Sequence, residues 1–459
     1  MNDVTLHNES SAAMTRPDQT LPKAEPTWPN AVAGQTHVVI VGGGFGGLLA
    51  AQSLKRAPVT VTLIDKNNYH LFQPLLYQVA TGGLSPGDIA SPLRSVLRRQ
   101  KNTRVLMGEV TRVDPAQRRL WMGEREIGYD YLVVATGAGH HYFGHDEWAK
   151  RAPGLKTISD ALEIRNRIFA AFEKAELESG SAARRRLLTF MVVGGGPTGV
   201  ELAGAVGEIA NYTLRHDFRN IDPTQARIIL VEGLGRVLPT YPPHLSARAA
   251  KSLGRLGVEV RTGTRVTRID ETVVELAARG RTERVESSVI LWAAGVRADG
   301  LAPMLVADPE TALDPAGRVL VEPDLTAPGH PEIFVIGDLA NFRHQTGSPL
   351  PGVAPVAMSQ GRYVARAIRR RLSGKPLKPY RYLNKGNLAT IGRAAAVADF
   401  GFFRFWGFPA WLLWLFVHLM YLVEFDNRLL VLVQWGWNYF TRNRGARLIE
   451  RRASDSAEV

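Results

Sequence analysis

Two continuous apolar runs, residues 38–41 and 190–193, stand out in the hydrophobic pattern of the chain, and each is followed at once by a cluster of glycines. Runs without polar alternation are typical of parallel strands that are buried on both faces. The residues after the two clusters, 48–56 and 200–214, have the composition of helices. The pattern therefore predicts an α/β chain that contains the same strand–turn–helix unit twice.

The first glycine cluster fits the spacing G-x-G-x-x-G at Gly42, Gly44 and Gly47. The first glycine allows a tight turn, the second lets the backbone approach a pyrophosphate, and the third lets the helix pack close to the strand. The helix N-terminus would offer unpaired N–H groups to phosphates. A second strand, 59–64, ends at Asp65, 23 residues after Gly42, where a carboxylate accepts hydrogen bonds from ribose hydroxyls. The alternative is a glycine-rich turn without a ligand.

The second cluster repeats the spacing at Gly194, Gly196 and Gly199. The next strand ends at Glu232, which comes 38 residues after Gly194 and is therefore later than the generic spacing. Either the intervening helix is long or residues 216–223 are an insertion. Glu232 suits the free ribose hydroxyls of NADH and would repel a 2′-phosphate, although a solvated acid at a strand end would show the same pattern.

Two dinucleotide folds in one chain predict a resident flavin dinucleotide in the first and a nicotinamide dinucleotide in the second, so that hydride passes between the rings. Residues 131–137 and 332–338 read as further strands that end in small-residue turns. These turns resemble those of the flavoproteins with two dinucleotide-binding domains, and residues 291–296 resemble the counterpart in their NAD domain. The resemblance implies that the turn at 135–137 passes near FAD and that Asp338 binds its ribityl chain.

The chain has no cysteine, which excludes disulfide reductases and flavoproteins with a cysteine relay, among them sulfide:quinone oxidoreductases. Three segments, 65–84, 195–204 and 385–399, resemble the type II NADH:quinone oxidoreductases, the single-subunit, non-proton-pumping NADH dehydrogenases. The match extends over about residues 36–450. It implies FAD-dependent transfer of two electrons from NADH to a membrane quinone, ubiquinone or menaquinone, by a peripheral enzyme of the respiratory chain.

The same resemblance implies a set of site residues. Glu201 would lie at the nicotinamide side of the flavin as an orienting or proton-handling group, unless it is only a carboxylate near a helix N-terminus. Lys385 would lie near the isoalloxazine or the quinone, unless it is a surface lysine. At the quinone-side helix start, Pro355 replaces the first glutamine of the family and has no N–H to donate, so only Gln360 remains of that pattern.

The residues expected to bind the two dinucleotides come from the glycine clusters, the strand-end acids and the small-residue turns. Those expected to bind FAD are Gly42, Gly44, Phe45, Gly46, Gly47, Asp65, Lys66, Val110, Ala135, Thr136, Gly137, Gly337, Asp338, Ala354 and Pro355. Those expected to bind NADH are Gly194, Gly196, Pro197, Thr198, Gly199, Glu232, Ala294 and Gly295. The histidines show no convincing ligand spacing, so no metal site is expected.

The C-terminal part of the chain is unusually apolar. Residues 405–423 are long enough to span a bilayer, but Gly407 and Pro409 interrupt the start and leave 411–423 as a clean helix. Residues 424–442 place most of their polar side chains along one side and are followed by arginines. The pattern predicts two helices on one membrane leaflet, with basic residues facing anionic headgroups. The alternatives are a buried helix pair, a dimer interface and a transmembrane span.

The formal net charge of +13 indicates an acidic partner: an anionic membrane surface, nucleic acid or phosphorylated ligands. The basic helix expected at 362–372 would contribute to membrane attraction or be a solvated face. No motif that reads RNA or DNA occurs, so no nucleic acid partner is expected. Two rival functions stay open: a flavoprotein reductase with a soluble acceptor, and a redox-sensing flavoprotein that binds nucleic acid.

We therefore expect an α/β protein with two Rossmann-type domains and a C-terminal membrane-associating helical region. The expected boundaries are 36–155 with 304–385 for the FAD domain, 156–303 for the NADH domain, 386–450 for the C-terminal region, a disordered tail at 1–35 and a short tail at 451–459. The family resemblance implies a homodimer. The missing signal-peptide pattern and the need for NADH indicate the cytoplasmic face of the inner membrane.

Overall fold

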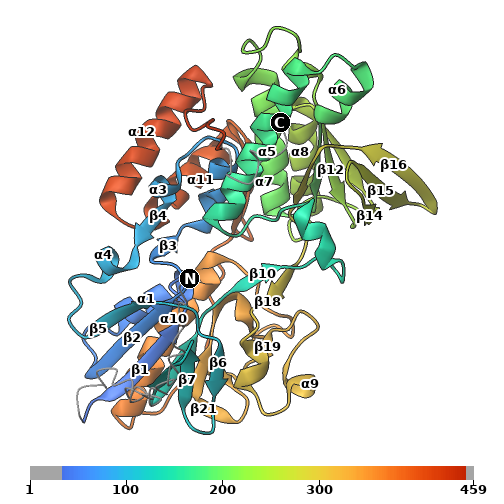
Figure 1. The fold of residues 1–459 in the computed structure, drawn as a ribbon. Coiled ribbons are helices and arrows are strands. Elements are labelled where there is room, and N and C mark those ends of the chain that lie inside the picture. The colour runs from blue at the N-terminus through green and yellow to red at the C-terminus, as the bar shows by residue number, and fades with distance from the viewer. Residues whose placement is uncertain (1–33, 451–459) are drawn as a thin grey trace, which may run out of the picture.

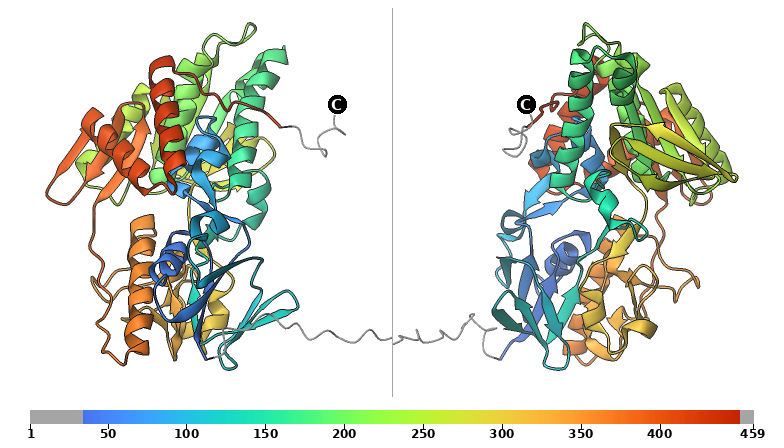
Figure 2. Two further views of the ribbon diagram at one scale, coloured as in Figure 1. Left: turned by 90° about the vertical axis from the view of Figure 1, so that its left-hand side faces the viewer. Right: turned by 45° about the vertical axis from the view of Figure 1, so that its right-hand side comes forward.

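The computed structural model describes residues 34–450, so the expected tails at 1–35 and 451–459 lie outside the described residues, apart from Gly34 and Gln35. Two bodies, each built on a parallel sheet, are stacked one above the other (Figure 1). The elements after residue 386, drawn in orange-red to red, gather on one flank of the upper body (Figure 2). The expected fold class, with two Rossmann-type units and an additional C-terminal region, is confirmed.

The lower body contains a six-stranded sheet in the order β20-β21-β9-β1-β2-β5. Every neighbouring pair is parallel except β20 and β21. Its strands are β1 (Thr36–Val41), β2 (Val59–Asp65), β5 (Thr103–Met107), β9 (Tyr131–Val134), β20 (Thr326–Ala327) and β21 (His330–Val335). The last two strands come from a distant part of the chain, so this sheet is assembled from two separated segments.

Helix α1 (Phe45–Ser53) follows the first glycine cluster and packs against β1 and β2, and helix α10 (Ala354–Leu372) packs across α1. The crossing is very close, because a Cβ atom on Gly361 would overlap the carbonyl oxygen of Gly46 and lie 3.0 Å from the nitrogen of Ala50. The start of α10 is thereby fixed beside the first glycine cluster.

The upper body contains a parallel sheet in the order β13-β12-β11-β17. Its strands are β11 (Thr189–Val193), β12 (Arg227–Glu232), β13 (Val258–Thr262) and β17 (Val289–Trp292), and an antiparallel sheet of β14 (Thr264–Ile269), β15 (Val273–Ala278) and β16 (Arg281–Glu286) follows β13. Its main helices are α5 (Ile158–Leu177), α7 (Pro197–Glu208) and α8 (Pro243–Arg255).

The late position of Glu232 has both of its expected causes. Helix α7 continues as a turn of π-helix, Ile209–Thr213, so the helical segment is long. A loop with a short 3-10 turn at Pro223–Gln225 then precedes β12. The acid therefore ends the strand next to β11, although it arrives late in the sequence.

Two short strands join the bodies. Strand β10 (Ala138–His140), which leaves the lower body after β9, pairs antiparallel with β18 (Val296–Ala298), which leaves the upper body after β17. This ribbon is visible between the two bodies in Figure 1. The two bodies are therefore connected directly beyond the carboxyl ends of β9 and β17.

The C-terminal region begins with an antiparallel sheet that the hydrophobic pattern does not predict. Its strands are β23 (Asn387–Gly392), β24 (Ala395–Asp399) and β25 (Arg404–Gly407), and helices α11 (Phe408–Tyr421) and α12 (Phe425–Thr441) follow. Pro409 does not delay α11, because a proline in the first helical turn lacks only an N–H that would be unpaired anyway. Within residues 34–450, no helix combines the length and the apolar character needed to cross a bilayer.

The segment after α12, residues 442–450, returns across the upper body, and we call it the C-terminal strap. Arg444 forms an ion pair of 2.8 Å with Glu208 at the end of α7, and both side chains are mostly buried. Farther along, Arg447 pairs with Asp217, and the Glu450 backbone bonds to the Asn166 side chain of α5. The strap therefore ties the C-terminal helices to the helices of the upper body.

Gly204 in α7 provides a test of this packing. A Cβ atom there would overlap the carbonyl oxygen of Ile391 in β23, whereas a Cβ atom on Gly254 in α8 would meet nothing within 4 Å. We expect Gly204→Ala to lower the melting temperature of the purified protein, since overpacking costs about 1–3 kcal/mol. The control Gly254→Ala should raise it slightly, by the higher helix propensity of alanine. Equal melting temperatures for the two variants would contradict the close crossing of α7 and β23.

Candidate active site

The first glycine loop has the geometry that the spacing predicts. Gly42 has a φ of +103°, and a Cβ atom on it would overlap the carbonyl oxygen of Ala135. A Cβ atom on Gly47 would overlap the carbonyl oxygen of Gly42, so α1 starts as close to β1 as the backbone allows. A Cβ atom on Gly44 would meet no atom within 4 Å. The loop is therefore tight where it turns and open at the N-terminus of α1.

Asp65 is held against this loop. Its Oδ2 accepts a hydrogen bond of 2.6 Å from the Gly43 N–H, and its Oδ1 accepts one of 2.7 Å from the Asn67 N–H. A carboxylate oxygen has more than one acceptor site. Asp65 is thus positioned by the backbone and keeps capacity for the hydroxyls of a ribose.

The second loop repeats this construction in the upper body. Gly194 has a φ of +108°, and a Cβ atom on it would lie 2.7 Å from the carbonyl carbon of Ala293. A Cβ atom on Gly199 would overlap the Gly194 carbonyl oxygen. Glu232 accepts from the Gly195 N–H at 2.6 Å, as Asp65 does from Gly43. The structure thus places an equivalent acid beside each glycine loop.

The exposed parts of the second loop lie at the start of α7. Pro197 and Thr198 are exposed, and a Cβ atom on Gly196 would meet nothing within 4 Å. Ala294 and Gly295 follow the carboxyl end of β17 and are at least partly exposed. All of the residues expected to bind NADH therefore lie along the carboxyl edge of one sheet, where ligands of open α/β sheets bind.

Three segments converge beside the first loop. The turn at residues 135–137 contacts Gly42, and Ile336, which precedes the Gly337 turn, lies close to Gly46. The start of α10 is the third segment, and Ala354 and Pro355 are partly exposed there. The hydroxyl oxygen of Thr136 is buried without a hydrogen-bond partner among the described residues.

Gln360, the residue expected on the quinone side of the flavin, is buried. Its side chain is only 1% exposed, and its amide oxygen accepts a hydrogen bond of 2.7 Å from the Gly337 N–H. Gln360 therefore holds the turn that carries Asp338. This hydrogen bond ties Gln360 in α10 to the turn that follows β21.

Glu201 lies in the second turn of α7. Its side chain is partly accessible to solvent, but protein atoms crowd around the carboxyl group, and this desolvation raises its pKa to about 8. A hydrogen bond from the Thr390 backbone acts in the opposite direction and is the smaller effect. A carboxylate stabilised by the helix dipole would have a lowered pKa, whereas burial moves the pKa of Glu201 in the opposite direction.

Two tyrosines lie near enough to Glu201 to be affected by its charge, and the sequence pattern did not identify them. Burial is the main cause that raises the pKa of Tyr77 well above its usual value, and the charge of Glu201 adds to it. The same two causes, in the same order, raise the pKa of Tyr241. Tyr77 lies within the segment 65–84 that carries the family resemblance, which was the available signal.

The remaining site residues lie farther from these loops or at the surface. Lys66 is exposed directly after β2, and Lys385 is exposed in the connection between α10 and β23. Val110 is buried in the core of the lower body. The structure therefore brings together the glycine loops, the acids and the small-residue turns, whereas Lys66 and Lys385 are exposed to solvent.

The C-terminal helices expose a large apolar surface, which we call the apolar face. It consists of Leu412, Phe416 and Met420 on α11, Leu429, Leu430, Leu432, Val433, Trp437 and Phe440 on α12, and Phe402 and Phe403 at the tip of the β24–β25 hairpin. The opposite side of these helices is anchored: Trp435 donates to the Gln78 side chain at 2.7 Å, and Asn438 donates to the Gly83 carbonyl. The apolar face is therefore exposed on helices whose opposite side is held in place by hydrogen bonds.

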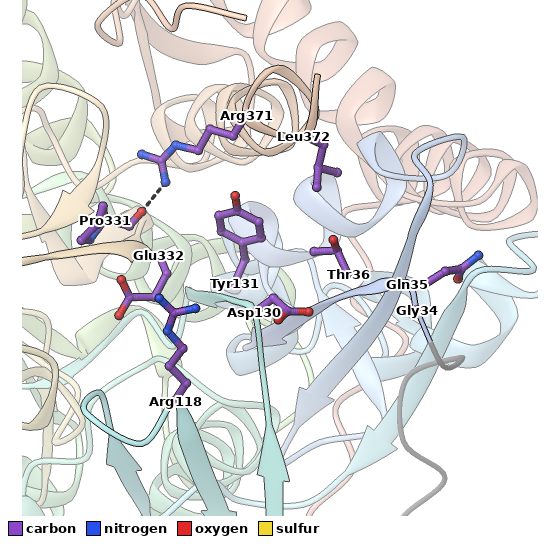
Figure 3. A pocket seen from close by; sticks show the side chains of 10 residues that line it. All are labelled: Gly34, Gln35, Thr36, Arg118, Asp130, Tyr131, Pro331, Glu332, Arg371 and Leu372. Atoms are coloured by element: carbon purple, nitrogen blue, oxygen red, sulfur yellow. Dashed lines mark hydrogen bonds between the residues drawn. The ribbon is translucent and has the colours of Figure 1, made fainter. Parts of the chain in front are cut away.

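A separate open hollow of about 640 Å³ lies at the other end of the lower body (Figure 3). Its lining residues are Gly34, Gln35, Thr36, Arg118, Asp130, Tyr131, Pro331, Glu332, Arg371 and Leu372. These residues gather at the amino ends of β1, β9 and β21, whereas dinucleotides bind at the carboxyl ends of such strands. The hollow is therefore not part of the candidate active site.

Comparison with known families agrees with this geometry. A family model described as pyridine nucleotide-disulphide oxidoreductase matches residues 36–361, and one described as NDH2 C-terminal domain matches residues 384–443. Because the chain has no cysteine, the disulfide chemistry in the first description is not available to it.

Relatives and solved structures are similar over nearly the whole chain. The Mycobacterium tuberculosis protein named type II NADH:quinone oxidoreductase NdhA is 48% identical, covering 91% of this chain and 90% of that protein. The one named type II NADH:quinone oxidoreductase Ndh is 46% identical, covering 92% of each. A structure of NDH2 from Plasmodium falciparum in complex with NADH matches with a TM-score of 0.82 at 21% identity, covers 91% of this chain and 100% of that one, and shows the common fold. With both family models matched and nearly half of all residues shared with these relatives, the chain belongs to the type II NADH:quinone oxidoreductases.

Proposed function

We propose that the protein transfers two electrons from NADH through FAD to a membrane quinone, without pumping protons. The observation that carries this proposal is the duplicated loop, in which two glycine turns of the same geometry each hold a strand-end acid at 2.6 Å from a loop N–H. One loop suits a resident dinucleotide and the other an exchanging one. We assign residues 36–155 and 304–385 to FAD, 156–303 to NADH and 386–450 to the membrane.

The lower body fits FAD by its own contacts. The open N-terminus of α1 suits the pyrophosphate, and Asp65 suits the ribose of the adenosine half. The buried Thr136 hydroxyl without a protein partner would find one in the cofactor. When bound there, FAD supplies the hydride acceptor and the two-electron store. Gln360 supports this site indirectly, because it fixes the turn from which Asp338 reaches the ribityl chain.

The upper body would bind NADH for each turnover. The N-terminus of α7 receives the pyrophosphate, and Glu232 accepts from the adenosine ribose hydroxyls. A 2′-phosphate at this position would bring two negative groups together, so Glu232 favours NADH over NADPH. The nicotinamide half then extends toward the lower body.

Glu201 would be mostly protonated at neutral pH, since its pKa is about 8. A neutral carboxyl group places no negative charge beside a reduced, anionic flavin, and it can donate as well as accept a hydrogen bond. We therefore propose that Glu201 orients the reacting rings or holds a proton for the quinone. Hydride transfer itself requires no protein acid or base at the carbon.

On the quinone side, the backbone at the start of α10 would donate the hydrogen bond that the family glutamine donates elsewhere. Pro355 lies in the first turn and donates nothing, and the N–H groups of Val356 and Ala357 both bond to the Val353 carbonyl, which leaves the Ala354 N–H as the donor at this helix start. This N–H would face a quinone carbonyl together with the positive end of the helix dipole. A donor from the peptide backbone would be insensitive to side-chain substitution at position 355.

The apolar face would rest on one leaflet of the membrane that contains the quinone. Interfacial helices bury such a face at the headgroup boundary, and basic side chains attract anionic lipids. The net charge of +13 agrees with an anionic surface. We further propose a homodimer formed through the C-terminal region and attachment at the cytoplasmic face of the inner membrane, where NADH is available.

The electron-transfer proposal is tested by anaerobic stopped-flow absorbance near the flavin band at about 450 nm, because the cofactor reports each half of the reaction separately. NADH should bleach the band, and a short-chain ubiquinone or menaquinone analogue should restore it rapidly over many turnovers. Restoration no faster than a buffer blank would refute the quinone acceptor and favour a soluble acceptor. If NADH did not bleach the flavin band, the protein would bind dinucleotides without transferring electrons.

The raised pKa of Glu201 predicts a pH-dependent stability. Between pH about 4.5 and about 8 the unfolded chain has released this proton while the folded chain retains it, so the wild type loses stability as the pH rises through this range. Glu201→Gln cannot lose a proton. Its melting temperature relative to the wild type should therefore rise from pH 5 to pH 8, measured on the FAD-loaded protein.

A matched control for this experiment is Glu310→Gln, which changes an exposed carboxyl group on the short surface helix α9 (Pro309–Ala312). Its melting temperature should follow that of the wild type at every pH. Parallel curves for Glu201→Gln and the wild type would mean that Glu201 is ionised in the folded protein at neutral pH.

The membrane proposal predicts the effect of charges on the apolar face. Val433 and Trp437 are both more than half exposed and lie one turn apart on α12. Replacing both by Glu should weaken binding to phosphatidylcholine–phosphatidylglycerol vesicles at least about tenfold, because each apolar side chain contributes about 1.5–3 kcal/mol when buried. The measurement is co-sedimentation with the vesicles. The control Leu177→Glu changes an exposed apolar residue at the end of α5 and should bind as the wild type does.

If the double variant bound vesicles as well as the wild type, the apolar face would not be the membrane surface. Loss of a dimer in the double variant, seen as a halved mass by light scattering in detergent, would then assign the face to the subunit interface.

A further inference from the structure

Phe143 lies in the connection between the two bodies and has three unusual properties together. Its backbone φ is +54°, a conformation that bulky residues rarely adopt. The residue is 60% exposed. The ring nevertheless packs on Gly295, because a Cβ atom there would lie 2.8 Å from the Phe143 Cζ. Strain of this kind persists where surrounding structure enforces it, and it concentrates at functional sites.

The segment around Phe143 is held firmly. Tyr142, the preceding residue, is buried and stacks on Trp292 with ring centroids 5.0 Å apart, and its hydroxyl donates to the Ala152 carbonyl at 2.9 Å. The indole N–H of Trp292 donates to the His141 carbonyl at 3.0 Å. Two neighbouring residues are thus fixed to the end of β17, and the ring of Phe143 is presented to solvent by a rigid support.

The order of strands in the upper sheet indicates which half of the dinucleotide reaches this ring. Strand β11, with its glycine loop, lies between β12 and β17. Glu232 ends β12 and so fixes the adenosine ribose on one side of the pyrophosphate. The nicotinamide half must therefore extend to the other side, toward the end of β17. Gly295, on which Phe143 packs, lies three residues beyond that end.

The ribbon between the bodies places the flavin side nearby as well. In this ribbon, Ala138 pairs with Ala298 and His140 pairs with Val296. The first strand begins directly after Gly137 of the flavin-side turn, and the second begins directly after Gly295. Phe143 follows three residues after His140 and folds back onto Gly295, so it lies where the two turns approach each other.

We propose that the ring of Phe143 forms one wall of the nicotinamide site and stacks on the dihydronicotinamide ring of NADH. The proposal rests on the assignment of NADH to the upper body. An aromatic ring offers a flat apolar surface to a flat apolar ligand, and stacking of a base on an aromatic side chain is worth about 1–3 kcal/mol. Phe143 would thus be a binding residue that fixes the nicotinamide for hydride transfer and shields one of its faces from water.

The variant Phe143→Gly removes the ring and adopts the positive φ without strain, so it should fold at least as well as the wild type. Anaerobic stopped-flow bleaching of the flavin by NADH gives the dissociation constant for NADH, and competition gives the one for ADP-ribose, which lacks the nicotinamide. We expect the NADH constant to rise about tenfold, which corresponds to about 1.4 kcal/mol. The ADP-ribose constant and the rate of flavin reoxidation by quinone should change less than about twofold.

Two further variants distinguish the flat ring from general effects. Phe143→Tyr keeps the ring and should bind NADH within about threefold of the wild type. Leu177→Ala shortens an exposed apolar residue in the same body, at the end of α5, and should change none of the constants.

If Phe143→Gly left the dissociation constant for NADH unchanged while NADH reduced the wild-type flavin normally, the role of Phe143 would be refuted and the proposed function would stand. Equal weakening of NADH and ADP-ribose would also refute that role, because the effect would then not come from the nicotinamide. If NADH failed to reduce the wild-type flavin, the proposed function would fail first and the inference with it.

Discussion

Both nucleotide loops depend on a backbone contact that leaves no room for a side chain. At Gly47 and again at Gly199, a Cβ atom would overlap the carbonyl oxygen of the glycine that begins the same loop. This contact sets the angle at which α1 and α7 leave their strands, and it points the N-termini of these helices across the carboxyl edges of the two sheets. The acids and the small-residue turns lie around this contact, and so do the proposed pyrophosphate sites.

This part of the protein could be predicted from the sequence because the constraint is local. The glycine spacing, the apolar runs and the strand-end acids lie within one strand–turn–helix unit, and each has one physical solution. The same holds for Asp65 and Glu232, whose hydrogen bonds to Gly43 and Gly195 are equivalent although their sequence spacings differ. The spacing rule did not predict the position of Glu232 in the sequence, because the helix and the loop between β11 and β12 can vary in length. Such variation leaves β12 next to β11 and Glu232 at its end.

Other features could not be predicted, because they depend on contacts between distant parts of the chain. Gln360 is buried against Gly337, and no local pattern distinguishes that role from contact with a quinone. The raised pKa of Glu201 comes from burial of its carboxyl group, and the opposing hydrogen bond comes from Thr390 in β23, far along the chain. The sheet β23–β25 itself is short, and the helical character of the residues after it dominates the hydrophobic pattern.

Helix α7 joins these local and distant features. Its first turn follows the second glycine loop, its second turn carries Glu201, and one turn later Gly204 allows β23 to cross in contact with the backbone. Its last residue, Glu208, pairs with Arg444 of the C-terminal strap. At 1.5 Å per residue, Glu201 and Glu208 are separated by about 10 Å along the helix. A single helix therefore spans the distance from the proposed nicotinamide site to the anchored side of the C-terminal helices. Because α7 is buried along most of its length, the apolar face and the second glycine loop keep a fixed relation to each other, which the proposed use of one substrate from water and another from a membrane requires.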